Sequence, residues 1–169
     1  EGPARARLMM VGEQPGDQED RQGHPFVGPA GVMLAKALDE AGIDRDAVFV
    51  TNAVKHFKFE QRGKRRLHKR PNAHEIDRCH LWLAFERKLI KPVLIVALGA
   101  TAVGSVSGKP SAIGTIRGKV MPLEGGGRML ATIHPSAILR TPDDKSRRAM
   151  FKVFVADLKT RARALAKTA

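Results

Sequence analysis

Carboxylates within a segment rich in glycine and proline are the first candidates for chemistry in this sequence. Residues 12–31 (GEQPGDQEDRQGHPFVGPAG) hold five glycines, three prolines and the acids Glu13, Asp17, Glu19 and Asp20. Glycine permits positive φ and close approach to the main chain, whereas proline fixes φ, so we expect a rigid and shaped wall. Four clustered acids in a chain with a net charge of +13 indicate a binding or catalytic pocket. The alternative is a solvated acidic turn that caps the next helix.

The elements around this segment must place it at one edge of a sheet. Apolar runs predict strands at 7–11, 47–51, 93–98 and 129–133. Helical spacing and capping signals predict helices at 31–41, 72–90, 100–106 and about 141–166. Asn72 is the expected cap of the second of these helices, and the pair Thr141-Pro142 is the expected start of the fourth. This alternation predicts a three-layer α/β/α sandwich around a central, mostly parallel, four-stranded sheet, in one domain that covers residues 1–169.

Four residues directly follow the carboxyl ends of these predicted strands. They are Glu13, Asn52, Gly99 and His134. Loops that leave the carboxyl ends of parallel strands form the ligand crevice of such sheets, so these residues should meet at one site. Asn52 could instead be a turn former after its strand, and His134 a histidine whose hydrogen bonds are satisfied at a strand end.

Missing motifs disfavour several functions. The segments 12–16 and 99–104 lack the lysine and hydroxyl that complete a phosphate-binding P-loop, and no strand runs into GxGxxG. Cys79 is the only cysteine, which excludes an intramolecular disulfide and a closed zinc site of several thiolates. No apolar run approaches the roughly 20 residues that span a membrane, and the N-terminus lacks a signal pattern. We therefore expect a cytoplasmic protein without membrane contact.

The distribution of positive charge indicates a polyanionic partner. Lysine and arginine total 30 against 17 acids, and residues 55–70 carry eight of these bases with a single acid, Glu60. Neutralising phosphates releases counterions, so such a segment is typical of nucleic-acid contact. A basic surface that serves only solubility is the alternative.

Three separated motifs resemble the uracil-DNA glycosylase superfamily, in particular its iron-sulfur branch. They are GEQPGDQED with PFVGPAG, then VTNAVKHFKF, then HPS near the C-terminus. The basic segment GKRRLH at 63–68 resembles the loop of the UdgX group, whose members become covalently attached to uracil-containing DNA. The resemblance implies a monomer that acts on single-stranded DNA containing uracil. A conventional multiple-turnover glycosylase and a non-catalytic damaged-DNA binding module are the alternatives.

The resemblance implies roles for residues of the glycine-rich segment and of the strand ends. A flipped base needs an aromatic face and an amide that reads its edge, and Phe26 and Asn52 fit these roles. Phe26 could otherwise be a core phenylalanine. Cleavage of the glycosidic bond builds positive charge on the sugar and negative charge on the departing base, so Glu13 is the expected anion and His134 the expected donor.

Neighbouring residues are expected to support this site. Gln14 should place Glu13 or a water molecule, and Gly12 should lie against the uracil. Asp17 is assigned to the uracil site as well, although Asp17 and Asp20 could mainly hold the loop through backbone hydrogen bonds.

His68 is the residue that sets the UdgX-like loop apart. Basic neighbours should keep its imidazole neutral and therefore nucleophilic, so we expect His68 to capture the sugar after uracil leaves. The alternative is one more contact in a phosphate-binding loop. The expected DNA contacts are Lys64, Arg65, Arg66, Lys69, Ser136 and Arg140.

The iron-sulfur branch implies a 4Fe-4S cluster with four ligands. Only His56 and Cys79 fall on matching positions, and two upstream cysteines are absent, so we expect that an N-terminal segment is missing and that this chain does not hold a cluster alone. Cys79 could otherwise be an inert buried thiol, and His56 a loop residue.

Overall fold

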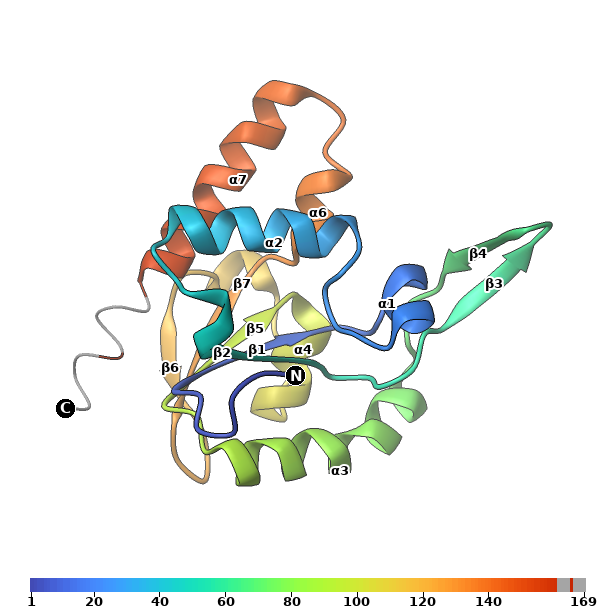
Figure 1. The fold of residues 1–169 in the computed structure, drawn as a ribbon. Coiled ribbons are helices and arrows are strands. Elements are labelled where there is room, and N and C mark those ends of the chain that lie inside the picture. Colours follow the sequence, from blue (N-terminus) through green and yellow to red (C-terminus); the bar gives the residue numbers. More distant parts are fainter. Residues whose placement is uncertain (161–164, 166–169) are drawn as a thin grey trace.

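The computed structural model describes residues 1–160 and residue 165, and its centre is a five-stranded sheet (Figure 1). The strands are β1 (Leu8–Gly12), β2 (Val48–Asn52), β5 (Leu94–Leu98), β6 (Val120–Pro122) and β7 (Arg128–Thr132). Their order is β2-β1-β5-β7-β6, and all neighbours are parallel except β6, which runs antiparallel to β7. The three-layer class is confirmed. The expectation of four strands is wrong, because the three-residue β6 lies in a glycine-rich stretch whose apolar pattern is too short to indicate a strand.

Side chains of the central strands alternate between two apolar layers. In β1, Leu8 and Met10 pack into one cluster with Leu34 of helix α2 (Pro29–Glu40) and with Leu158 of α7 (Asp144–Lys159). Met9 and Val11 point the other way, into a cluster with side chains of α3 (Ala73–Ile90) and α4 (Ala100–Ser107). Figure 1 shows α2 and α7 on one side of the sheet and α3 on the other. Burial on both faces explains why the parallel strands are apolar throughout.

Helix ends follow the capping chemistry of the sequence in one long helix and depart from it in another. Asn72 caps α3 as expected, since its side chain accepts a hydrogen bond from Glu75 N while the Glu75 carboxylate accepts one from Asn72 N. The start of α7 was expected at Thr141, which is wrong: Asp143 caps it by accepting from Ser146 N at 2.8 Å. A carboxylate is the stronger cap here, and the Thr141 hydroxyl donates to Ala137 O instead. The expected end of this helix near 166 lies outside the described residues.

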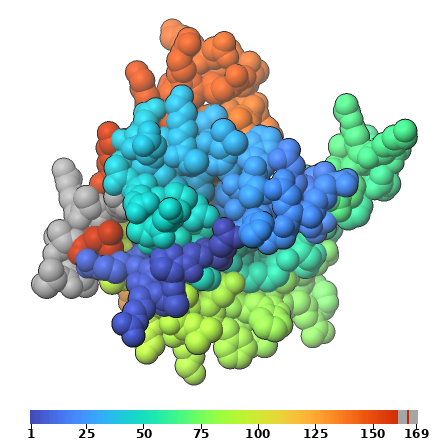
Figure 2. Space-filling model, viewed as in Figure 1, coloured from blue at the N-terminus to red at the C-terminus, as the bar shows by residue number. Residues whose placement is uncertain are grey.

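Several short elements have no clear sequence signal. They are α1 (Asp17–Gln22), a 3₁₀ turn (Arg45–Ala47), α5 (Ile113–Ile116), α6 (Pro135–Leu139) and the antiparallel hairpin of β3 (Phe59–Arg62) and β4 (Arg65–His68). The hairpin projects from the body of the molecule, as Figures 1 and 2 show. Most side chains of its two strands are charged or polar, so the sequence lacks the regular alternation of apolar and polar residues that would predict strands. Within the described residues, no helix has the length and apolar character needed to cross a bilayer.

Candidate active site

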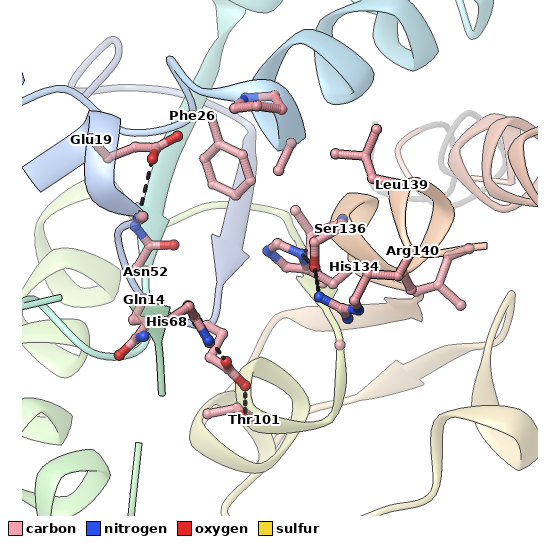
Figure 3. Close-up of a pocket in the computed structure, with 18 of the residues that line it drawn as sticks. Gln14, Glu19, Phe26, Asn52, His68, Thr101, His134, Ser136, Leu139 and Arg140 are labelled. Carbon is pink, nitrogen blue, oxygen red and sulfur yellow. Dashed lines mark hydrogen bonds and ion pairs between the residues drawn. The ribbon is translucent and has the colours of Figure 1, made fainter. Parts of the chain in front are cut away.

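A cavity of about 820 Å³ opens where β1, β2, β5 and β7 end (Figure 3). Its wall includes Glu13, Asn52, Gly99 and His134, the four residues that were expected to meet at this edge of the sheet. His68, the last residue of β4 in the hairpin, also lines this cavity. The parallel strands therefore bring a carboxylate, an amide and one imidazole to the cavity, and the hairpin brings a second imidazole.

Glu13 is held by a hydroxyl from the first turn of α4. Thr101 Oγ1 donates to Glu13 Oε2 at 2.6 Å, and His68 Nε2 lies 3.5 Å from Glu13 Oε1. The carboxylate is thus fixed on one oxygen and faces the cavity with the other. Thr101 was not predicted; the only sequence signal for it is a hydroxyl just after Gly99, where a parallel strand passes into a helix.

Gly12, Phe26 and Asn52 form a narrow slot beside Glu13. A Cβ atom on Gly12 would lie 2.4 Å from Asn52 Oδ1 and 2.7 Å from Phe26 Cζ, so both side chains approach the bare backbone. Phe26 has a φ of +57°, which a bulky residue rarely adopts. Its carbonyl sits against Gly31, where a Cβ would lie 1.7 Å from Phe26 O. The close approach of α2 at Gly31 therefore holds the main chain of Phe26, from which the ring extends toward Gly12.

Glu19 closes the glycine-rich loop. Its Oε1 accepts from Gly28 N at 2.8 Å and its Oε2 accepts from Gly16 N at 3.1 Å, so one side chain joins two distant points of the loop. Support of the loop by Asp17 and Asp20 was the alternative to a uracil-binding Asp17, and the side chains of both acids pair with Arg66. Asp17 does line the cavity, at its outer part near the hairpin.

His134 is a neutral imidazole with a defined tautomer. Burial lowers its pKa from the usual 6.5 to about 4, although the nearby Glu13 carboxylate opposes this shift. Ser136 N donates to Nδ1 at 3.2 Å, and a backbone N–H can only donate, so Nδ1 must accept. The ring proton therefore resides on Nε2. Ser136 Oγ lies 2.8 Å from Nδ1 and accepts a hydrogen bond from Arg140 Nη1. These contacts hold the orientation of the imidazole ring.

The low pKa of His134 predicts a loss of stability in acid. An unfolded histidine binds its proton near pH 6.5 and the folded one only near pH 4, so the unfolded state binds more protons between these values. Stability is therefore full above pH 6.5 and falls as the pH drops toward 4. A shift of this size corresponds to about 3 kcal/mol.

The measurement compares urea unfolding of the wild type and a His134→Asn variant from pH 7 to pH 4. We expect the free energy of unfolding of the wild type to fall by about 3 kcal/mol more than that of the variant. The difference between the two curves removes the contribution of the other histidines. Parallel curves would show that His134 is not held neutral by the fold.

Gln14 fastens the hairpin at its base. Its Nε2 donates to Lys58 O at 3.3 Å and to Lys69 O at 3.0 Å, while its Oε1 accepts from Lys58 N at 3.2 Å. The amide thus binds both strands where they leave the domain. These contacts tie Gln14 to the segment that carries His68, and its role in placing Glu13 or a water molecule stays a prediction.

The groups that face His68 differ from those expected for a purely basic loop. The Glu13 carboxylate lies beside its Nε2, and the Phe57 ring lies 6.2 Å from the imidazole, centroid to centroid. Arg62, Arg66 and Lys69 each pair with a carboxylate other than that of Glu13. The ring is therefore positioned by an anion and an aromatic face.

The expected DNA contacts fall into two groups. Lys64 and Arg65 are exposed at the hairpin turn, and Ser136 and Arg140 lie in the cavity wall. Lys69 Nζ pairs with Glu60 Oε2 at 2.7 Å and stays largely exposed. Arg66 is different, because its side chain is only 17% exposed and turns inward to Asp17 and Asp20.

His56 and Cys79 lie together on the α3 side of the domain. Cys79 Sγ is 3.8 Å from His56 Nδ1 and accepts a hydrogen bond from Lys55 N at 3.3 Å. Cys79 is buried and His56 is exposed. The described residues contain no group of three or more possible metal ligands, so these two donors fit half of the set that a 4Fe-4S cluster requires.

These features define an α/β protein with a cavity at the carboxyl ends of its parallel strands, beside a basic hairpin. The chain belongs to the uracil-DNA glycosylase superfamily, whose family model matches residues 1–159. The membership inferred from the three sequence motifs is thereby confirmed.

Relatives named Type-4 uracil-DNA glycosylases are 32–38% identical to this chain. The one from Thermotoga maritima is 38% identical over 153 residues, which cover 90% of this chain and 76% of the relative. The one from Pyrobaculum aerophilum is 36% identical and covers 84% and 72%. The one from Archaeoglobus fulgidus is 32% identical and covers 83% and 71%. The similarity extends over most of both chains in each case.

Proposed function

We propose that this protein excises uracil from DNA and then remains bound to the abasic sugar through His68. Membership in the superfamily and the names of the relatives support uracil excision. The observation that carries the second step is the position of His68, whose Nε2 lies 3.5 Å from Glu13 Oε1 inside the same cavity. A single strand of DNA is the proposed substrate, because it offers a base without the cost of unpairing a duplex. A monomer is the proposed acting form.

Binding of the base rests on the slot beside β1. The Phe26 ring offers a face for stacking, and the Asn52 amide offers both a donor and an acceptor for the edge of the base. Gly12 has no Cβ, so these two side chains can lie directly against the main chain and close to each other.

Cleavage follows from two opposite charges at the ends of the breaking bond. The bond between C1′ and N1 of uracil breaks with both electrons going to the base, which leaves positive charge on the sugar. The Glu13 carboxylate stabilises that positive charge, and the Nε2–H of neutral His134 donates to the oxygen that gains negative charge. The low pKa of His134 keeps it a neutral donor over the physiological pH range.

Capture ends the reaction with a covalent bond. The lone pair of His68 Nε2 forms a bond to C1′, and the resulting imidazolium loses its Nδ1 proton to water. The uracil anion takes up one proton from water, so no oxidant or further reactant is needed. The product is a histidine-linked abasic DNA and free uracil.

A 4Fe-4S cluster is proposed as a structural group bound in part by His56 and Cys79. When bound, the cluster would tie the start of α3 to the loop after β2 through these two donors. None of the proposed steps of excision and capture involves the cluster.

A denaturing gel tests the proposed reaction directly. Protein is mixed with an excess of uracil-containing single-stranded oligonucleotide, and both released uracil and the shifted band are measured. We expect the wild type to give a band of protein plus oligonucleotide with at most one uracil per protein, and His68→Ala to give no band. His80→Ala is the matched control, because His80 is an exposed histidine on α3 outside the cavity.

Each contrary outcome would support a different function or a different nucleophile. A shifted band with His68→Ala would assign capture to another nucleophile. Release of several uracils per wild-type protein would indicate a conventional glycosylase, and binding without release would indicate a damaged-DNA binding module.

A further inference from the structure

The hairpin of β3 and β4 depends on contacts with the rest of the domain for its position. Among residues 1–160 and 165 it pairs with no other strand, and an isolated two-stranded hairpin is at best marginally stable in water. Gln14 holds its base through Lys58 and Lys69. His68, at the end of β4, can face Glu13 only if the hairpin also keeps its angle to the domain.

Arg66 provides a second and stronger attachment. Its Nε binds Asp17 Oδ1, its Nη1 lies 2.6 Å from Asp20 Oδ2, and its Nη2 donates to Asp17 O at 3.2 Å. Both acids belong to α1, so the guanidinium joins the hairpin to that helix. Planar, multiply bonded contacts of this kind are characteristic of arginine and not of lysine.

Aromatic rings hold the same guanidinium from the hairpin side. Arg66 Cζ lies 5.3 Å from the centroid of the Phe57 ring and 5.0 Å from that of Phe59. The side chain is 17% exposed, and its hydrogen bonds to Asp20 and Asp17 raise its pKa further. Three of its N–H groups are therefore engaged within the protein, which leaves little for a DNA phosphate.

Arg66 and His68 lie on the same face of the hairpin. They are two residues apart in β4, and His68 is paired with Phe59 in β3. Glu13 stands four residues before Asp17 in the glycine-rich loop. An attachment of Arg66 to Asp17 and Asp20 therefore fixes the face that carries His68 against the loop that carries Glu13.

We infer that Arg66 is a positioning residue for the capture step, and that it acts by fastening the hairpin to α1 instead of binding DNA phosphates. This inference rests on the proposed function, because capture by His68 is the step that it serves. When the attachment is intact, His68 reaches the sugar before water does. When the attachment is lost, uracil is still released, but water adds to C1′ of the sugar and free abasic DNA results.

The test separates cleavage from capture in Arg66→Ala. Released uracil and covalent adduct are measured in the same reaction, and we expect the ratio of adduct to free abasic DNA to fall by about 10²-fold, a loss typical of a displaced reacting group. Arg65→Ala is the matched control: it removes the same charge from the neighbouring residue, which lies on the other face of the hairpin and has no ion pair or ring contact within the described part of the chain. Loss of a DNA contact at Arg65 lowers the amount of DNA bound, but the ratio counts only DNA that has already lost its uracil, so we expect Arg65→Ala to keep the wild-type ratio.

Arg66→Lys distinguishes geometry from charge. Lysine keeps the positive charge but cannot bridge two carboxylates and a carbonyl with a planar fork, so its ratio should stay well below that of the wild type. Full recovery in Arg66→Lys would overturn the inference. Equal losses of DNA affinity in Arg65→Ala and Arg66→Ala, with the adduct ratio unchanged, would instead assign Arg66 to phosphate binding.

Amide hydrogen exchange of the free protein tests the attachment without DNA. We expect the amides of residues 59–68 to exchange at least about tenfold faster in Arg66→Ala than in Arg65→Ala, because the hairpin opens locally. Unchanged exchange would contradict the inference even if adduct formation fell. If the wild type forms no adduct but the exchange differs as expected, the proposed function fails while the attachment stands.

Discussion

Replacement of Glu13 by glutamine is expected to slow uracil release by on the order of 10³-fold, with the fold and the DNA affinity retained. Glutamine has nearly the same shape and can still accept the 2.6 Å hydrogen bond from Thr101 Oγ1. It removes only the negative charge that stabilises the sugar cation. The effect should therefore appear in the rate constant of a single turnover and not in the concentration of DNA that half-saturates the protein.

The control for this experiment is Glu40→Gln. Glu40 is exposed at the end of α2 and does not line the cavity, yet its replacement changes the net charge by the same amount. Any general gain in DNA affinity from the lost acid will therefore appear in both variants. A decrease of less than tenfold in Glu13→Gln would mean that another group stabilises the sugar cation.

Replacement of Gly12 by alanine is expected to reduce kcat/KM for uracil release by about 10²-fold. The new Cβ would lie 2.4 Å from Asn52 Oδ1 and 2.7 Å from Phe26 Cζ, so both side chains must move. Both contacts are with the far ends of side chains, so the domain can relax while the slot for the base is lost. Steady-state kinetics and a thermal unfolding curve together measure the two effects.

Gly104→Ala is the matched control for Gly12→Ala. Gly104 lies within α4, and a Cβ built on it meets no other heavy atom within 4 Å. Alanine is a better helix former than glycine, so this variant should be at least as stable as the wild type and equally active. Normal kcat/KM in Gly12→Ala would place the uracil elsewhere in the cavity.

The parts of the fold that could be predicted are those with long, regular patterns. The four buried parallel strands were predicted because each is a continuous apolar run, and α3 because it has both a cap at Asn72 and helical spacing. β6 was missed because three residues carry no period. The hairpin was missed because the charges that suit its exposed strands also describe an unstructured basic loop.

The candidate site could be predicted where topology alone decides it. Glu13, Asn52 and His134 meet because parallel strands end at one edge, and that rule needs no side-chain detail. The supporting contacts could not be predicted in the same way. Thr101 reaches Glu13 across 88 residues and Arg66 reaches Asp17 across 49, and such pairings depend on how closely separate elements approach in the folded chain.

The hairpin is also closed on itself where it joins the domain, since Lys69 N donates to Lys58 O at 2.9 Å. The chain therefore leaves and re-enters the β2–α3 connection at nearly one point, and the path of the sheet does not depend on what lies between. We therefore expect that lengthening or shortening this connection leaves Glu13 and the sheet edge in place. Under the proposed function, insertion or deletion in one surface connection would be enough to add or remove attachment to DNA, while the sheet and its cavity stay unchanged.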